Sequence, residues 1–425
     1  MKALDAAVRS LRALKSWEHA SSRGAMQSLD WRPCQAVAQK LGYQRHPLTI
    51  HVTGSKGKGT VCALVGAALE RAGFRVGVVT SPHAHHFGER LRIGMRPAGD
   101  ALAPHLQRAV DVILDARRCN DAVLGAATQF DAFIAAALKA SQKCDAVVVE
   151  VGLGGRRDST NFLQAPITAL VSVEREHTEV LGDSLRGIAG EKAGICTKDG
   201  VLVLGDLGRA PREKAVEIAR KRGATPRATR PARIIQGIPA GSLSVARGVL
   251  DAVGGFVDGS LLDDPRVLRT ARAALPARAE SVEGGYVDGA HTAKSVAAFA
   301  KSVKRKGRGV VLIIALRSDK NIEDVARAVR EHLNPERVVS CSCGEGFVSA
   351  ETLAAAFDGE VASSPAAAFD AVPCGEYVRV ALGSFELSAA ARAAFLDVGQ
   401  RSFSPRRCTR RASTRHRSRA GPSPP

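Results

Sequence analysis

The sequence predicts an α/β protein with two domains, in which a larger parallel-sheet domain is followed by a smaller, Rossmann-like one. Short apolar runs alternate with amphipathic helical segments along most of the chain. A loop rich in glycine and lysine separates the first apolar run from a long apolar helical pattern. The 425 residues also exceed what a single hydrophobic core usually holds. We place the domain boundary near Pro276, so that residues 1–275 form the first domain, 276–400 the second and 401–425 a basic tail.

The elements follow from periodicity and from turn residues. Residues 1–47 are expected to be a helical lead-in. Strands are expected at 48–52, 76–80, 145–151, 167–173 and 201–205, with helices at 61–72, 102–117, 130–139 and 212–222 and a further candidate helix at 242–253. Residues 81–97 and a linker containing Pro265 and Pro276 are expected to be loops. In the second domain, strands are expected at 286–287, 310–315, 337–341 and 377–381, and helices at 293–303 and 322–333.

Charge narrows the class of partner. The formal net charge is +19, and eight arginines without any acid in residues 401–425 leave 19 − 8 = +11 for the rest. This excess suits an anionic substrate or nucleotide. Nucleic acid is compatible with the charge, but the body lacks aromatic residues interleaved with basic clusters, so we expect no nucleic-acid partner. The arginine-, serine- and proline-rich tail is expected to be disordered.

Hydropathy and cysteine usage bear on location. The sequence has no apolar run near the ~20 residues of a membrane span. The nine cysteines are dispersed and form no C-x-x-C pair, which favours a reducing compartment over a disulfide framework or a zinc site. We therefore expect a cytoplasmic protein, with a mitochondrial or plastid location left open.

The first strand leads into T-G-S-K-G-K-G-T, which has the order of a phosphate-binding loop. Glycines let backbone N–H groups close around phosphate oxygens, a lysine reaches the outer phosphates and a hydroxyl suits Mg²⁺. The spacing departs from G-x-x-x-x-G-K-[ST], because one glycine is closer and another follows the lysine. The alternative is a flexible turn. The candidate residues are Gly54, Gly57, Lys58, Gly59 and Thr60.

Two polar groups follow neighbouring strands of the predicted sheet. Glu150 ends a buried strand, and the loop after it, V-G-L-G-G-R-R-D-S-T-N, supplies Arg156, Asp158 and Asn161. His177 follows the next strand. Because the carboxyl ends of parallel strands meet at one edge, Glu150 is a candidate Mg²⁺ ligand and His177 a candidate ligand of a second metal. For Glu150 alone, a solvated acid at a strand end is an equally good explanation.

Three further signals are weaker. Lys192 in E-K-A-G-I lies at a helix end and, taken alone, is best explained as a surface lysine. Asp288 and His291 in D-G-A-H follow the first strand of the second domain and could contact a nucleotide across a cleft between the domains. Arg278, ten residues before Asp288, could supply a cation for phosphates.

In order, these motifs resemble folylpolyglutamate synthase/dihydrofolate synthase, a branch of the Mur ligase superfamily. The resemblance rests on seven pieces at compatible spacing, spread over residues 51–291: H-V-T-G-S-K-G-K-G-T, T-S-P-H, F-G-E-R-L-R-I-G, E-V-G-L-G-G-R-R-D-S-T-N, H-T-E-V-L-G-D, E-K-A-G-I and D-G-A-H. It implies a Mur ligase-like fold and an ATP-dependent amide ligase. ATP would phosphorylate a carboxyl group of dihydropteroate or a folate, and the amine of L-glutamate would attack the acyl phosphate.

The resemblance also implies roles for individual residues. Lys58, His177 and Lys192 would be catalytic, and Lys192 matches the family lysine that is carbamylated. The nucleotide would be bound by Gly54, Gly57, Lys58, Gly59, Thr60, Arg278, Asp288 and His291. Two Mg²⁺ ions are implied, with Thr60, Ser81, Glu150 and His177 as ligands. Phe130 and Asp131 of T-Q-F-D, with Arg156 and Asp158, would bind the second substrate. A monomer is expected.

The sequence departs from the family pattern at several positions. Lys56 stands where asparagine is usual, Asp131 and Glu176 exchange one acid for another, Arg157 replaces an apolar residue and Thr292 an asparagine. No Gln/Asn helix motif is recognisable at 242–253. These changes leave open a catalytically weakened nucleotide-binding paralogue. A Mur-type peptidoglycan ligase is the other alternative, although it would carry an N-terminal domain of about a hundred residues. T-Q-F-D leans towards dihydrofolate synthase, and the choice among first, later or both glutamate additions stays open.

Overall fold

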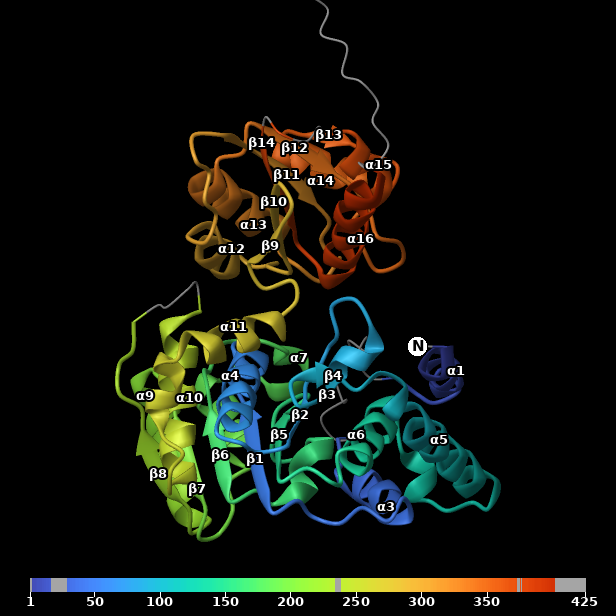
Figure 1. Cartoon of the computed structure of the whole chain (residues 1–425), viewed down its shortest axis with the longest axis vertical. Helices are drawn as coiled ribbons and strands as arrows, with labels where there is room; N and C mark the ends of the chain where they lie inside the picture. Colours follow the sequence, from blue (N-terminus) through green and yellow to red (C-terminus); the bar gives the residue numbers. More distant parts are fainter. Residues whose placement is uncertain (1, 17–28, 234–237, 373–374, 376, 402–425) are drawn as a thin grey trace, which may run out of the picture.

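The computed structural model consists of two lobes stacked along the long axis of the molecule (Figure 1). It describes residues 2–16, 29–233, 238–372, 375 and 377–401, with side chains left aside at 393 and 395–401. The predicted tail after residue 401 and part of the lead-in therefore lie outside the described residues. Among the described residues before the first strand, two segments are helices, α1 (Lys2–Leu11) and α3 (Arg32–Lys40).

The larger lobe is built on an eight-stranded sheet of order β4-β3-β2-β5-β1-β6-β7-β8. Its strands from β2 to β8 in that order are parallel, and β3 and β4 add an antiparallel hairpin at one edge. The bounds are β1 (Leu48–Thr53), β2 (Val76–Val79), β3 (Leu91–Ile93), β4 (Arg96–Pro97), β5 (Ala146–Glu150), β6 (Ile167–Leu170), β7 (Val201–Leu204) and β8 (Thr225–Ala228).

Helices cover both faces of this sheet, because side chains of the central strands alternate between two apolar cores. In β5, Ala146 and Val148 belong to the core under one set of helices, and Val147 and Val149 to the core under the other. The first set is α4 (Lys58–Arg71), α10 (Ala240–Val253) and α11 (Pro265–Ala273). The second includes α3, α5 (Ala103–Arg118) and α6 (Gln129–Ala140), and α8 (Leu185–Ala193) and α9 (Arg209–Lys221) share a further cluster with β7. The short α7 (Thr178–Leu181) precedes α8.

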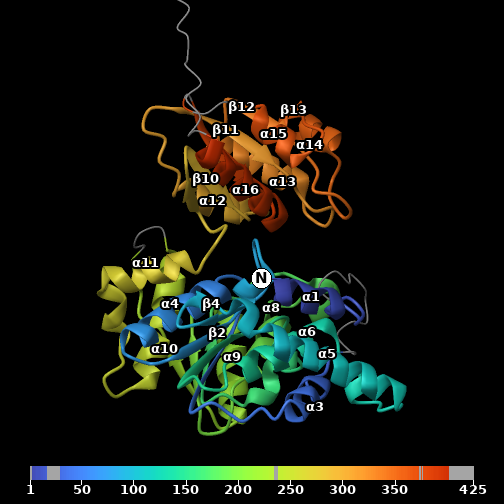
Figure 2. The same ribbon diagram turned by 45° about the vertical axis from the view of Figure 1, so that its right-hand side comes forward.

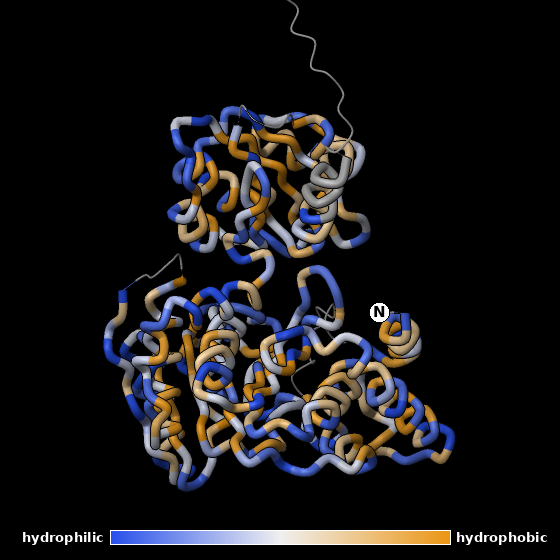
Figure 3. The backbone as a smooth tube through the Cα atoms, in the orientation of Figure 1, coloured by the Kyte–Doolittle hydropathy of each residue, from blue (hydrophilic) through white to orange (hydrophobic). Residues whose placement is uncertain are grey.

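The smaller lobe holds a six-stranded sheet of order β13-β12-β11-β14-β10-β9, parallel except for β9. Its strands are β9 (Glu280–Val282), β10 (Gly285–Asp288), β11 (Gly309–Ile314), β12 (Arg337–Ser340), β13 (Glu360–Val361) and β14 (Tyr377–Leu382). Its helices are α12 (Ala293–Ala300), α13 (Ile322–Ala328), α14 (Ala350–Phe357), α15 (Pro365–Asp370) and α16 (Phe385–Arg401). In Figure 3, apolar segments run through the inside of both lobes, and polar ones lie mostly at their surfaces.

Two predicted loops are wrong. Residues 81–97 contain a 3₁₀ turn and the β3–β4 hairpin rather than a continuous loop. The segment that begins at Pro265 is a helix, because Asp264 caps it by accepting from the amide of Arg266 at 2.9 Å and proline fits the first helical position. The candidate helix at 242–253 is confirmed as α10, and the predicted boundary near Pro276 falls between α11 and β9.

Each edge strand of the larger sheet contains a proline. Pro97 lies in β4 at one edge and Pro226 in β8 at the other, so each edge strand lacks one backbone donor. The smaller lobe lies above the larger one in both views (Figures 1 and 2). Nζ of Lys294 lies 2.7 Å from Oε1 of Glu174. Within the described residues, no helix combines the length and apolarity needed to cross a membrane.

Candidate functional site

The glycine loop joins β1 to α4 at the carboxyl edge of the larger sheet. Gly54 has a φ of 151°, and a Cβ there would lie 3.0 Å from the amide nitrogen of Ser172, so the close approach requires glycine. Gly57 has a φ of 86° and precedes the first helical residue, Lys58. No side chain caps this end of α4. Its amides therefore face the loop without a side-chain acceptor, as an anion-binding helix start requires.

Lys58 folds over its own loop. Its ammonium donates to the carbonyl oxygen of Gly54 at 2.9 Å. Thr60 lies in the first turn of α4 and is partly exposed. The structure therefore puts the predicted lysine and hydroxyl at the start of one helix, on the side of the sheet where β1 ends.

Glu150 lies beside this loop because β5 pairs with β1, with Glu150 opposite Val52. Its Oε2 accepts from the amide of Ser81 at 3.0 Å, and a Cβ on Gly59 would lie 3.4 Å from the same oxygen. Burial raises the pKa of the Glu150 carboxyl, and the positive charge of Lys58 opposes that rise. The structure thus brings together four predicted residues from three segments of the chain: Lys58, Gly59, Ser81 and Glu150.

A pocket between the lobes opens onto this group. Gly59, Ser81 and Glu150 line it from the larger lobe, and Arg278 and Phe385 from the smaller. The guanidinium of Arg278 lies 5.1 Å from the centre of the Phe385 ring, and its charge acts on the Glu150 carboxyl. A cation from the second domain therefore lines the same pocket as the glycine loop, and its contact with phosphates stays a prediction.

The donor types in this pocket fit a hard divalent cation. A carboxylate at Glu150 and hydroxyls at Ser81 and Thr60 are oxygen donors of the kind Mg²⁺ binds together with phosphates. Throughout the part of the chain that the structure describes, no group of three or more His, Cys, Asp and Glu side chains is arranged to hold a metal. The first predicted metal site would thus combine one carboxylate with hydroxyls, and it stays a prediction.

Lys192 is buried, which corrects its interpretation as a surface lysine. Its side chain is 2% exposed, and Nζ lies 3.4 Å from Oε1 of Glu176. The pKa of Lys192 is lowered from its usual 10.5 to about 8, mainly by burial and also by the charge of Lys58, with Glu176 opposing the shift. An amine in this state is uncharged far more often than an exposed lysine near neutral pH.

His177 lies beyond β6 in a left-handed conformation, with a φ of 48°. Its side chain is 55% exposed, and Nδ1 lies 3.8 Å from Oε1 of Glu179. Burial lowers the pKa of His177, Glu176 and Glu179 oppose that shift, and the charges of Lys58 and Lys192 add to it. The side chain therefore lies in the same electrostatic neighbourhood as the loop lysine, and its role as a second metal ligand stays a prediction.

Two predicted substrate residues hold the backbone. Asp131 and Thr128 form a capping box at the start of α6, where Asp131 Oδ2 accepts from the amide of Thr128 at 2.8 Å. Asp158 accepts from the amide of Leu153 at 2.8 Å and from the amide of Thr160 at 2.9 Å. Both carboxylates are buried. They shape the loop after β5, and a contact with substrate stays a prediction for both.

The other two predicted substrate residues lie against the same loop. Phe130 fits closely over Gly152, where a Cβ would lie 2.6 Å from Cζ of the ring. Arg156 lies beside Glu191, with Nε 3.3 Å from Oε2, and is about half exposed. The aromatic ring and the exposed cation are thus next to the loop that Asp158 shapes.

In the second domain, Asp288 fixes the segment that carries Arg278. Its Oδ2 accepts from the amide of Ala279 at 2.5 Å and its Oδ1 from the amide of Ala290 at 2.7 Å. Burial raises the pKa of Asp288 to about 6. His291 is turned towards its own backbone, with Nδ1 2.8 Å from the carbonyl oxygen of Gly289, and burial lowers its pKa to about 4. Asp288 therefore holds the backbone next to Arg278, and a contact of either residue or of His291 with a nucleotide stays a prediction.

No protein-family model matches the chain. The sequence is 35% identical over 173 residues to dihydrofolate synthase/folylpolyglutamate synthase of Haemophilus influenzae and 32% identical over 198 residues to the protein of that name in Bacillus subtilis. These alignments cover 40% and 45% of this chain. They cover 38% and 44% of the two relatives, so the matched region is less than half the length of either.

Similarity to solved structures extends over nearly the whole chain. E. coli FolC in complex with DHPP and ADP superposes with a TM-score of 0.77 at 24% identity, covering 93% of this chain and 98% of FolC. The chain has the folylpolyglutamate synthase fold. The bifunctional folylpolyglutamate synthase/dihydrofolate synthase of Yersinia pestis complexed with AMPPNP and a Mn ion gives a TM-score of 0.73 at 25% identity, with 92% and 97% covered. The predicted Mur ligase-like, two-domain fold and the predicted resemblance are both confirmed.

Several residues of this site were not predicted from the sequence. Glu176 was noted only for its difference from the family, yet it is the partner of the buried Lys192. Glu191 is buried beside Arg156, and Arg92 and Phe385 line the pocket. None of these residues has a local sequence signal. By contrast, the T-x-x-D spacing that begins at Thr128 is a capping-box pattern, so the helix-capping role of Asp131 could have been predicted.

Proposed function

We propose that this chain is an ATP-dependent ligase that joins L-glutamate to dihydropteroate or to a folate through an acyl phosphate. The observation that carries the proposal is the convergence of the glycine loop, Ser81, Glu150 and Arg278 on one pocket between two lobes. The names of the relatives and the ligands in the solved structures support the substrate class.

The chain's own residues would bind and orient the nucleotide. The uncapped amides at the start of α4 and the ammonium of Lys58 would hold phosphate oxygens. Arg278 would approach from the second domain and offset charge that develops on the transferring phosphoryl group. Asp288 would keep Arg278 in place through its bond to the amide of Ala279.

A divalent metal fits beside these groups. Thr60, Ser81 and Glu150 would hold Mg²⁺, which when bound would neutralise phosphate charge and orient the terminal phosphate. The Yersinia pestis structure was obtained with AMPPNP and a Mn ion, which supports a nucleotide-linked metal. A second Mg²⁺ at His177 is part of the proposal.

Carbamylation of Lys192 is chemically favoured by its surroundings. With a pKa of about 8, about a quarter of the amine would be uncharged at pH 7.5, and the uncharged amine is the form that adds to CO₂. The product would be a carboxylate next to Glu176. The nearby cations Lys56 and Lys58 would offset the repulsion between the two acids.

Product analysis tests the proposal. The protein is incubated with Mg-ATP, L-glutamate and either dihydropteroate or tetrahydrofolate, and products are identified by mass. A mass increase of one glutamate, dependent on both ATP and the pteroate or folate, is expected. Nucleotide binding without any such product from either substrate would contradict the ligase and favour the weakened paralogue. We retain a monomer, in the cytoplasm or an organelle, as part of the proposal.

A further inference from the structure

The backbone of Lys56, the cation inside the glycine loop, is held by hydrogen bonds to the segment just after β6. The hydroxyl of Ser172 accepts from the amide of Lys56 at 2.8 Å and donates to its carbonyl oxygen at 3.0 Å. Ser55 is tied in the same way, with its hydroxyl accepting from the amide of Glu174 at 2.9 Å. The backbone here has little freedom, so only the four-carbon side chain of Lys56 can move its charge.

The ammonium of Lys56 shares a carboxylate with a buried neighbour. Nζ of Lys56 lies 3.8 Å from Oε2 of Glu176, while Nζ of Lys192 lies 3.4 Å from Oε1. In its unmodified, charged form, the buried Lys192 needs a counter-ion, because an unpaired buried charge is costly. The side chain of Lys56 is 46% exposed, and an ion pair this open to water is weak. Glu176 is therefore essential to Lys192 and dispensable to Lys56.

Cations outnumber acids at this point between the lobes. Glu174 lies against Lys294 of the second domain, 2.7 Å away, which leaves Glu176 to balance its two lysines. The ammonium of Lys58 is bonded to a neutral carbonyl. Partial burial lowers the pKa of Lys56, the charges of Lys58 and Lys320 add to that shift, and Glu176 and, more weakly, Glu174 oppose it. Cations that repel one another in this way are stabilised by an anion placed among them.

We propose that Lys56 is a second phosphate-binding lysine of the loop. Its ammonium gives up its ion pair with Glu176 and contacts the terminal phosphate of a bound nucleoside triphosphate instead. The inference rests on the nucleotide site of the proposed function. It goes beyond that proposal by assigning Lys56 a contact that is made only with the terminal phosphate of a triphosphate. The terminal phosphate is the relevant one, because Lys56 lies on the side of Glu176 and Lys192, where phosphoryl transfer would occur. The exchange leaves Glu176 entirely to Lys192.

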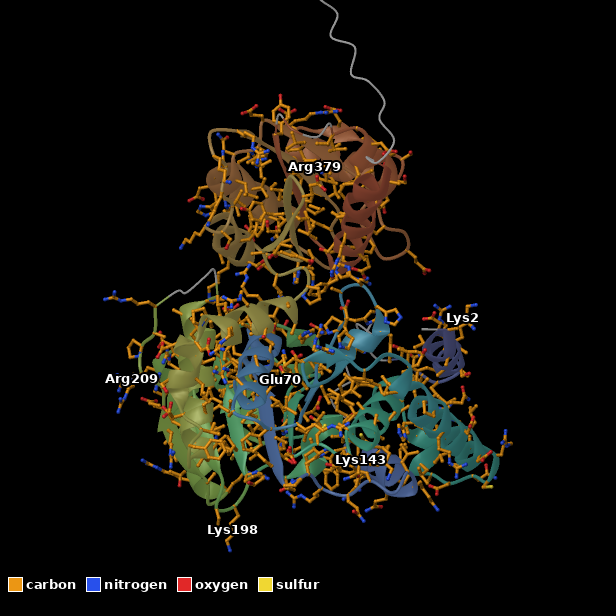
Figure 4. The ribbon with its side chains drawn as sticks, viewed as in Figure 1. Lys2, Glu70, Lys143, Lys198, Arg209 and Arg379 are labelled. Carbon is orange, nitrogen blue, oxygen red and sulfur yellow. The ribbon has the colours of Figure 1, made fainter. Side chains whose placement is uncertain are left out.

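Nucleotide titration calorimetry tests this assignment with the full chain. Mg-AMPPNP and Mg-ADP are titrated into the unmodified protein, Lys56→Gln, Lys56→Arg and Lys198→Gln. Lys198 is an exposed lysine at the edge of the larger lobe that faces away from the second domain (Figure 4), so it is the matched control.

We expect Lys56→Gln to weaken AMPPNP binding about tenfold and ADP binding less than twofold, because only the triphosphate offers the contact. Lys56→Arg should retain most of the affinity, and Lys198→Gln should change neither constant. An equal loss for both nucleotides in Lys56→Gln would show a merely structural role and overturn the proposal. Unchanged AMPPNP affinity would overturn it as well.

A second pair of variants tests the exchange itself. Glu176→Gln removes the competing carboxylate, so it should tighten AMPPNP binding when Lys56 is present and have no such effect in Lys56→Gln. The same response in both backgrounds would overturn the exchange. AMPPNP selectivity that depends on Lys56, in a protein that forms no glutamate product, would sustain this inference while the proposed function fails. Binding of neither nucleotide to the unmodified protein would overturn both.

Discussion

Replacing the buried Lys192 by methionine should make the first domain more stable near neutral pH while it removes activity. The pKa of Lys192 falls from 10.5 to about 8 on folding, and each unit corresponds to about 1.4 kcal/mol. The native state thus carries a penalty of about 3 kcal/mol whenever the lysine is charged. Methionine matches the length and flexibility of the lysine stem without its charge.

The pH dependence gives this prediction its sign. Below pH 8 both states hold the proton, so the full penalty acts on the native protein. Between pH 8 and 10.5 the unfolded chain holds the proton that the native chain releases, so stability of the unmodified protein rises with pH. The advantage of Lys192→Met should therefore be about 1–3 kcal/mol at pH 7, since Glu176 loses a partner, and should fall by about 2 kcal/mol by pH 9.5, because the unmodified protein gains about 1.4 kcal/mol for each pH unit above 8.

Urea unfolding followed by tryptophan fluorescence measures the effect. Of the two tryptophans, Trp31 directly precedes α3 and reports on the larger domain. Buffers free of CO₂ keep the amine unmodified, and Lys198→Met serves as an exposed control without a pH-dependent difference. A Lys192→Met protein that is less stable at pH 7, or whose advantage is equal at pH 7 and 9.5, would refute the reasoning. Added bicarbonate should change the unmodified protein alone.

Three further substitutions test the glycine loop and its metal. Lys58→Ala should abolish product formation while unfolding free energy changes by less than about 1 kcal/mol, and normal turnover would exclude this loop as the phosphate site. Gly57→Ala should lower stability by about 1–3 kcal/mol in thermal unfolding, because its φ is 86° and the new Cβ would lie 2.9 Å from Oγ of Ser242; an unchanged melting temperature would contradict this. Glu150→Gln keeps the acceptor for the Ser81 amide but removes the charge, so the Mg²⁺ concentration for half-maximal ATP turnover should rise about tenfold or more, and an identical Mg²⁺ titration would argue against a metal ligand.

The central elements were predictable because they are apolar and periodic. β5 and β11 are short, mainly apolar runs that are buried on both faces, and such runs follow from sequence alone. The β3–β4 hairpin was missed, because Arg92 and Pro97 make its sequence resemble that of a polar loop. Its pairing also depends on β2, which lies earlier in the chain. α11 was missed because proline was interpreted as a breaker where it is the first helical residue.

The site was predictable where strand topology decides it. Lys58 and Glu150 lie at the ends of neighbouring parallel strands, so the rule that carboxyl ends share an edge predicts that they lie together, whereas Ser81 was predicted only from the family resemblance. The pairing of Lys192 with Glu176 could not be predicted, because it depends on a turn at His177 with positive φ and on the packing that buries α8. Contacts of this kind come from tertiary structure and have no local sequence signal.

The prolines at the two margins of the larger sheet affect how molecules of this protein behave at high concentration. A strand from another copy that tried to extend the sheet would find a missing donor at Pro97 on one side and at Pro226 on the other. Arg96 and Arg227 add like charges at the same places, so two copies approaching margin to margin would repel. The sheet is thereby protected from open-ended stacking into fibrils, without any additional layer to cover it.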